Sequence, residues 1–68
     1  MTTRHIAAVV QRGTWITVIG RNGDRASTTS RATADAWCVA DGQRIDWTTP
    51  MPTLDGRTAY PLTPLEDQ

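Results

Sequence analysis

The sequence is poor in the residues that build catalytic and metal sites, because it holds one cysteine, Cys38, and one histidine, His5. A single cysteine excludes an intrachain disulfide, and the two residues together cannot supply the four ligands of a structural zinc site. We expect Cys38 to be a small buried apolar residue and His5 a solvated one, instead of a nucleophile and a general base. The aspartates show no calcium-loop spacing. The sequence therefore predicts a protein that is not an enzyme and binds no metal and no cofactor.

Long apolar runs are also missing. None approaches the roughly 20 residues that a membrane helix needs, and the first residues are not followed by the apolar stretch of a signal peptide. We therefore expect a protein of the cytoplasm, or of a phage particle within a bacterial host, without membrane contact. Lysine is absent and all seven basic residues are arginine, which is typical of a GC-rich bacterium or its phage.

The 68 residues have a formal net charge of zero, but the charges are separated along the chain. Residues 1–34 hold five arginines and one aspartate, a net charge of +4, whereas residues 35–68 hold two arginines and six carboxylates, a net charge of −4. The basic half is a candidate for contact with nucleic acid, although such a footprint normally raises the net charge of so small a domain.

The most β-favouring stretch is TWITVIG, residues 14–20, and a tight-turn signal stands at each end of it. Arg12-Gly13 predicts a two-residue connection to the preceding strand, and Asn22-Gly23 predicts a type I′ turn. The signals indicate a three-stranded antiparallel meander over about residues 4–12, 14–20 and 24–30.

Both faces of this meander are apolar at their centres. The expected register pairs Val9 with Ile16 on one face and sets Val10 beside Trp15 on the other. A half-solvated sheet carries one polar face, so we expect the chain's own helix to cover one side and the tail or a second molecule to cover the other. We expect Trp15 in the core and a protein interface on the Val9 face, which also holds Val18.

Residues 30–42 allow two interpretations. Ser30 suits a helix N-cap, four alanines favour helix, and Gly42 suits the position after the last turn. The alternative is a strand pair around Asp41-Gly42, which would complete a small all-β barrel. The helix is favoured. We therefore expect an α+β domain, residues 1–48, with a helix over about 31–41 and a short fourth strand over 44–48.

Residues 49–68 contain all four prolines, which break regular elements and indicate an extended tail. The apolar residues of this tail are too many for a solvated linker, so we expect it to pack on the domain or on a neighbouring subunit. Together with the sheet face, the tail defines a candidate protein interface of Val9, Ile16, Val18, Leu54, Tyr60 and Leu62.

Three short segments within residues 13–42 carry a resemblance to a known family. They are Gly13-Thr14-Trp15, Gly23-Asp24-Arg25 and Thr33-Ala34-Asp35-Ala36-Trp37. This pattern resembles the β-β-β-α arm-type DNA-binding domain of tyrosine integrases, whose sheet enters the major groove. The resemblance implies a core that includes Trp15, Ala36 and Trp37, and a nucleic-acid surface of Arg12, Arg21, Arg25 and Thr29. The missing lysines and the acidic second half depart from that family, and the same order of elements is similar to HicB-type antitoxins, which bind a protein.

Two functions are compatible with these features. We expect a small protein-binding or assembly module that associates with itself or with another protein through an apolar sheet face. The other candidate is a small nucleic-acid-binding domain that uses the arginine-rich meander.

Overall fold

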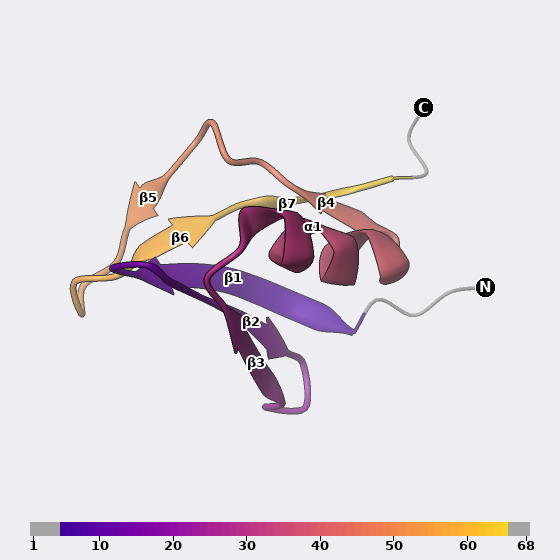
Figure 1. Ribbon diagram of the computed structural model, residues 1–68, viewed down its shortest axis with the longest axis horizontal. Helices are drawn as coiled ribbons and strands as arrows, with labels where there is room; N and C mark the ends of the chain where they lie inside the picture. The colour runs from indigo at the N-terminus through magenta and orange to yellow at the C-terminus, as the bar shows by residue number, and fades with distance from the viewer. Residues whose placement is uncertain (1–4, 66–68) are drawn as a thin grey trace.

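The fold combines one helix with two antiparallel sheets in the computed structural model, which describes residues 5–65 (Figure 1). The start of the expected first strand, residue 4, lies outside the described residues. Along the chain the elements are β1 (Ile6–Arg12), β2 (Trp15–Gly20), β3 (Arg25–Thr28), α1 (Arg31–Ala40), β4 (Gln43–Ile45), β5 (Met51–Pro52), β6 (Thr58–Tyr60) and β7 (Leu62–Pro64). The predicted α+β class is confirmed, with a helix where the alternative placed a strand pair.

The larger sheet has five strands in the order β3-β2-β1-β6-β5, and the smaller sheet pairs β4 with β7. The predicted meander forms β1, β2 and β3, but β1 instead of β2 becomes the middle strand of the sheet. The fourth strand, expected over residues 44–48, is present as the shorter β4. α1 lies against one face of the larger sheet (Figure 1).

The turn between β1 and β2 consists of Gly13 and Thr14, so that Arg12 pairs with Trp15. Gly13 has a φ of +60°, whereas Thr14 does not take a positive φ, and glycine at the first central position is typical of a type II′ turn. The expected turn at Arg12-Gly13 is therefore wrong by one residue, which shifts the register by two. A shift of two leaves every side chain on its original face.

The turn between β2 and β3 is a three-residue loop closed by Gly20 and Asp24. The Gly20 N–H donates to the Asp24 carbonyl at 2.7 Å, and the Gly23 N–H donates to the Gly20 carbonyl at 3.0 Å. Gly23 has a φ of +92° and Asn22 does not take a positive φ, which is typical of a type I turn closed by a glycine bulge. The expected type I′ turn is therefore wrong, because it needs a positive φ at both residues.

α1 begins and ends where the sequence predicts. The Ser30 hydroxyl caps the helix by accepting a hydrogen bond from the Thr33 N–H at 3.2 Å. Gly42, directly after the C-cap residue, has a φ of +78°. The buried residues of the helix are Ala34 and Cys38, so Cys38 is the small buried residue that the sequence predicts.

The hydrophobic core lies between α1 and the face of the larger sheet that holds Val9 and Ile16, each of which is 1% exposed. Half-buried Trp37 and Trp47 pack against it. The core consists of Val9, Ile16, Val18, Ala34, Cys38, Ile45 and Tyr60. The helix therefore covers the face that was expected to meet a partner, and that expectation is wrong.

Trp15 lies on the opposite face of the sheet, because side chains alternate along β2 and Ile16 points into the core. The Trp15 side chain is 56% exposed. The expectation that Trp15 belongs to the core is therefore wrong. The sequence pattern correctly separates Trp15 from Ile16, but it does not decide which of the two faces the helix covers.

The C-terminal segment packs on the domain by strand pairing instead of lying on a sheet face. β6 pairs with β1 and places Tyr60 beside Val9, β5 pairs with β6, and β7 pairs with β4. The Tyr60 hydroxyl donates to Gln11 Oε1 at 3.0 Å, and its ring meets the Trp47 ring edge-on with centroids 4.8 Å apart. Tyr60 thus joins the end of the chain to its beginning.

The Asp41 carboxylate ties the end of α1 to the start of β1. Its two oxygens accept the backbone N–H groups of His5 and Ile6, each at 2.8 Å. The Gln43 side-chain amide donates to Asp41 Oδ2 and to the Ile6 carbonyl, both at 2.9 Å. Burial on its own raises the pKa of Asp41, but the donors from His5, Ile6 and Gln43 outweigh burial and hold the pKa below its usual range.

Adjacent residues on β2 should respond very differently to truncation. We predict that Ile16→Ala lowers the free energy of unfolding by about 2–5 kcal/mol, because it leaves a cavity in the core. Trp15→Ala should cost about 1 kcal/mol or less, since the side chain is largely in water. Urea unfolding followed by far-ultraviolet circular dichroism measures both. An equally large loss for Trp15→Ala would mean that the Trp15 face is covered in solution.

The lowered pKa of Asp41 predicts a specific acid sensitivity. A folded-state pKa below the unfolded value of about 3.9 contributes stability above that pH, and the contribution disappears as pH falls through the folded pKa. Asp41→Asn should therefore lower the free energy of unfolding by about 2 kcal/mol at pH 7 and by less at acidic pH. Urea midpoints measured across this pH range test the prediction, with Asp35→Asn as the control. Parallel pH profiles for Asp41→Asn and the unsubstituted chain would contradict it.

Candidate functional site

The candidate site is the face of the five-stranded sheet opposite α1, which we call the outer face. Its members follow from strand alternation and from the register, because directly paired residues share a face. The outer face consists of Ala8, Val10, Arg12, Trp15, Thr17, Ile19, Arg25, Ser27, Met51 and Ala59.

The outer face has a small apolar centre and larger side chains around it. Val10 lies at the centre, flanked in the register by Thr17 and Ala59. Trp15 and Met51 are both exposed at the periphery, although they come from strands far apart in the sequence. Single exposed apolar residues are ordinary, but tryptophan and methionine exposed on the same sheet face, here on strands separated by β1 and β6, are residue types enriched at protein interfaces.

The structure separates the six residues expected at a protein interface. Four of them belong to the core, namely Val9, Ile16, Val18 and Tyr60. Leu62 is half-buried in β7, and Leu54 is fully exposed in the loop between β5 and β6. The sequence analysis therefore missed Trp15 and Met51 as surface residues. Strand alternation was the signal for Trp15, but for Met51 no local signal was present, since β5 joins the sheet through β6.

The structure brings two of the residues expected to meet nucleic acid onto the outer face. Arg12 of β1 pairs with Trp15, and Arg25 of β3 pairs with Ile19. The two arginines therefore lie beside opposite ends of β2. Arg21 is exposed in the β2–β3 turn, and exposed Thr29 directly follows β3. Among residues 5–65, no carboxylate forms an ion pair with any of these arginines.

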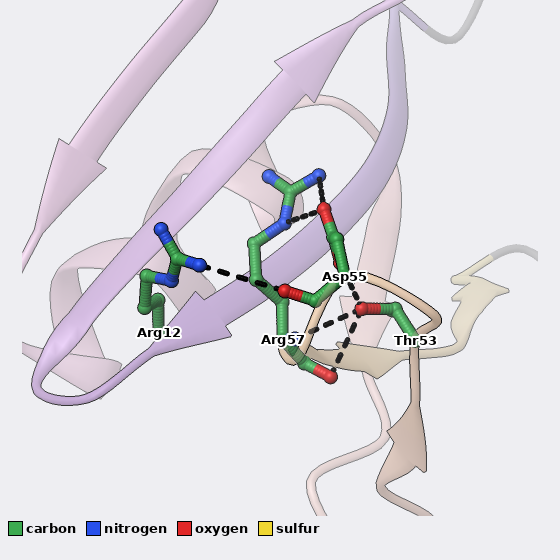
Figure 2. Close-up of polar contacts among 4 residues, drawn as sticks. All are labelled: Arg12, Thr53, Asp55 and Arg57. Carbon is green, nitrogen blue, oxygen red and sulfur yellow. Dashed lines mark hydrogen bonds and ion pairs between the residues drawn. The ribbon is translucent and has the colours of Figure 1, made fainter.

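Near Arg12, the charged side chains of the loop between β5 and β6 pair with each other (Figure 2). Arg57 donates to Asp55 Oδ2 from Nε at 2.8 Å and from Nη2 at 2.7 Å. The Thr53 hydroxyl donates to the same carboxylate, and both groups hold the pKa of Asp55 well below its usual range. Arg12 reaches only the Asp55 carbonyl, at 3.5 Å, which is a marginal distance for a hydrogen bond. The Arg12 guanidinium therefore remains available to a partner.

Several carboxylates of the acidic half form local ion pairs or hydrogen bonds with side chains or backbone groups. Asp41 holds the start of β1, and Asp55 is paired with an arginine. Asp46 accepts hydrogen bonds from the hydroxyls of Thr48 and Thr49, which lower its pKa. The charge that the outer face offers to a partner is therefore positive, although the whole chain is neutral.

The side chains considered for catalysis lie apart from one another. Cys38 is buried, and burial, followed by the charges of Asp35 and Asp41, raises the pKa of Cys38 to about 11. His5 Nε2 lies 3.5 Å from Asp24 Oδ2 at the surface. Within residues 5–65, no group of three or more histidine, cysteine, aspartate or glutamate side chains is arranged to hold a metal ion. In the same range, no helix has both the length and the apolar character needed to cross a membrane.

The raised pKa and burial of Cys38 predict an unreactive thiol. At pH 8 and without denaturant, a chromogenic disulfide reagent should modify Cys38 far more slowly than it modifies the unfolded chain, because the thiolate is scarce and the reagent cannot reach it. The labelling rate should rise through the urea unfolding transition. Rapid modification of the native protein would contradict the placement of Cys38 under α1.

No protein-family model matches this chain, and neither a curated protein nor a solved structure matches it. Of the core residues that the integrase resemblance implies, Trp37 packs against the core, while Trp15 and Ala36 are exposed. The relation to tyrosine integrases or to HicB-type antitoxins therefore stays a hypothesis.

Proposed function

We propose that this chain is a small, non-enzymatic binding module whose outer face docks on the acidic and apolar surface of another protein. The observation that carries the proposal is the exposed Trp15, paired across the sheet with Arg12, on a face whose arginines have no carboxylate partner among residues 5–65. Tryptophan and arginine are the residues that most often dominate the binding energy of protein interfaces. Arg12 and Arg25 would then contact acidic residues around an apolar centre.

The chemistry of the outer face favours a protein over nucleic acid. Val10 at the centre of this face is buried and lies between Ala59 and Thr17. The Thr17 hydroxyl is already hydrogen-bonded to the Ser27 hydroxyl at 3.0 Å, so the centre has few side-chain donors for base edges. Among residues 5–65, only three arginines on or beside the face lack a carboxylate partner, namely Arg12, Arg21 and Arg25. Such a small footprint supports weak phosphate binding only.

The same charges favour another protein over a second copy of this chain. Two outer faces packed against each other would bring arginine close to arginine in either relative direction, because Arg12 and Arg25 mark opposite ends of the face. Like charges placed together across an interface cost binding energy. The outer face therefore suits a different protein better than the expected self-association through a sheet face.

Nucleic-acid binding is the second candidate, and one observation favours it. Arg12 and Arg25 share the sheet face opposite the helix with an aromatic side chain, Trp15, on which a base could stack. The integrase resemblance also implies Arg12 and Arg25 as nucleic-acid contacts, although it assigns Trp15 to the core. In about 0.15 M salt we expect duplex affinity no tighter than the non-specific range, roughly 10⁻⁴–10⁻⁶ M.

A titration of matched variants separates the two candidates. The probes are an amphipathic helical peptide with one glutamate face and one leucine face, and a DNA duplex, each followed by fluorescence anisotropy. We predict that the peptide binds more tightly than the duplex, and that Trp15→Ala combined with Arg12→Ala weakens peptide binding about tenfold or more. Arg44→Ala removes an exposed arginine from β4 and should leave peptide binding unchanged.

Two results would contradict the protein-binding proposal. One is equal peptide affinity for the combined Trp15→Ala and Arg12→Ala variant and for Arg44→Ala, which would mean that the outer face does not bind the peptide. Submicromolar duplex binding that is lost when Arg12, Arg21 and Arg25 are replaced together, with a salt slope that falls by about one unit per lost contact, would make nucleic acid the ligand.

A further inference from the structure

We propose a second binding site on this chain, at the β3 edge of the five-stranded sheet. It takes up an extended peptide segment of another protein as a sixth strand, and it places one apolar side chain of that segment in a cavity between β3 and α1. The site does not depend on the outer face, so each proposal can fail without the other.

The first observation is a strand edge with outward-facing backbone groups. β3 is the terminal strand of the sheet. The Gly20 N–H bonds the Asp24 carbonyl, and hydrogen-bonded pairs alternate along an antiparallel ladder. The register then turns the N–H and C=O groups of Ala26 toward β2, and those of Arg25 and Ser27 away from it. An incoming strand would pair with Arg25 and Ser27.

The second observation is an open cavity directly beside this edge. Its volume is about 270 Å³, which is below the usual range for cofactor sites but sufficient for one large apolar side chain. Its lining includes Ile6, Val18, Ala26 and Trp37, with His5 and Asp24 among its polar residues. The cavity lies on the core side of the sheet, between Val18 and Ala26 of the β2–β3 corner and Trp37 of α1.

The edge and the cavity fit one extended ligand. In an antiparallel pair, residues directly opposite each other point to the same face. The ligand residue opposite Ala26 would therefore point to the core side of the sheet, into the cavity and toward Trp37. Its neighbours would point to the other side, past Arg25 and Ser27. Backbone bonds would supply affinity and the cavity would supply selectivity, as in other strand-addition complexes.

The shape of the cavity argues against a second copy as the ligand. If two β3 strands paired, each would present Ala26 and Thr28 on the core side, and these side chains are too small to fill the cavity of the other copy. The opposite edge of the sheet is also a poor template, because β5 has two residues and ends at Pro52. The site therefore suits a peptide with leucine, phenylalanine or a residue of similar size.

The test uses a short capped peptide of alternating threonine and leucine, titrated into isotopically labelled protein. We expect amide shifts in β3 and at Ile6, together with a shift of the Trp37 indole. Ser27→Pro should weaken binding about tenfold or more, since it removes an outward N–H at an edge position that tolerates proline. Ser27→Ala keeps that N–H and should bind like the unsubstituted chain.

A second pair of variants tests the cavity without changing the backbone. Ala26→Leu should fill the cavity and weaken binding about tenfold or more, while Ala36→Leu, the same change at an exposed helix position, should have no effect. Circular dichroism verifies that each variant is folded.

Three results would overturn the proposal. One is equal affinity for the Ser27→Pro and Ser27→Ala variants together with equal affinity for Ala26→Leu and Ala36→Leu. Another is a set of peptide-induced shifts centred on Trp15. The third is β3 shifts that appear on concentrating the protein alone, which would identify a second copy as the ligand.

Discussion

β1 can support the core only because strands pair with both of its edges. Val9 lies between Val18 of β2 and Tyr60 of β6 and is held under α1 by these neighbours. The pairing with β6 brings the Tyr60 hydroxyl to Gln11 and the Tyr60 ring to Trp47. A domain of this size has few core residues, so a strand contributed from the end of the chain is a large share of the stabilising contacts.

One helix can cover only one face of a sheet, and this limit shapes the surface of the protein. α1 is anchored over the Val9 face by its C-cap, since Asp41 binds the first N–H groups of β1. The other face keeps Trp15 and two arginines exposed. The whole chain has a formal net charge of zero, but this sheet face is positive. Several carboxylates of the second half form local hydrogen bonds and do not neutralise it.

Local signals were sufficient for the helix but not for the two hairpin turns. Ser30 and Gly42 bounded the helix correctly, since caps depend on neighbouring residues alone. The β1–β2 register was missed because Gly13 can occupy either central position of a hairpin turn. The role of Tyr60 was missed because pairing with β1 is a long-range contact without a local signature. Alternation separated Trp15 from the core positions, but only the tertiary structure decided which face became the candidate site.

The strand order has a consequence for the protein during its synthesis. Gln11 and Tyr60 are 49 residues apart, so β1, β2 and α1 leave the ribosome well before β6 does. Until residues 58–60 leave the ribosome, one edge of β1 has no partner strand, and β1 is an apolar strand that includes Val9 and Val10. Such an edge is a template for pairing between neighbouring nascent chains. The last third of the sequence thus provides the strand that closes this edge.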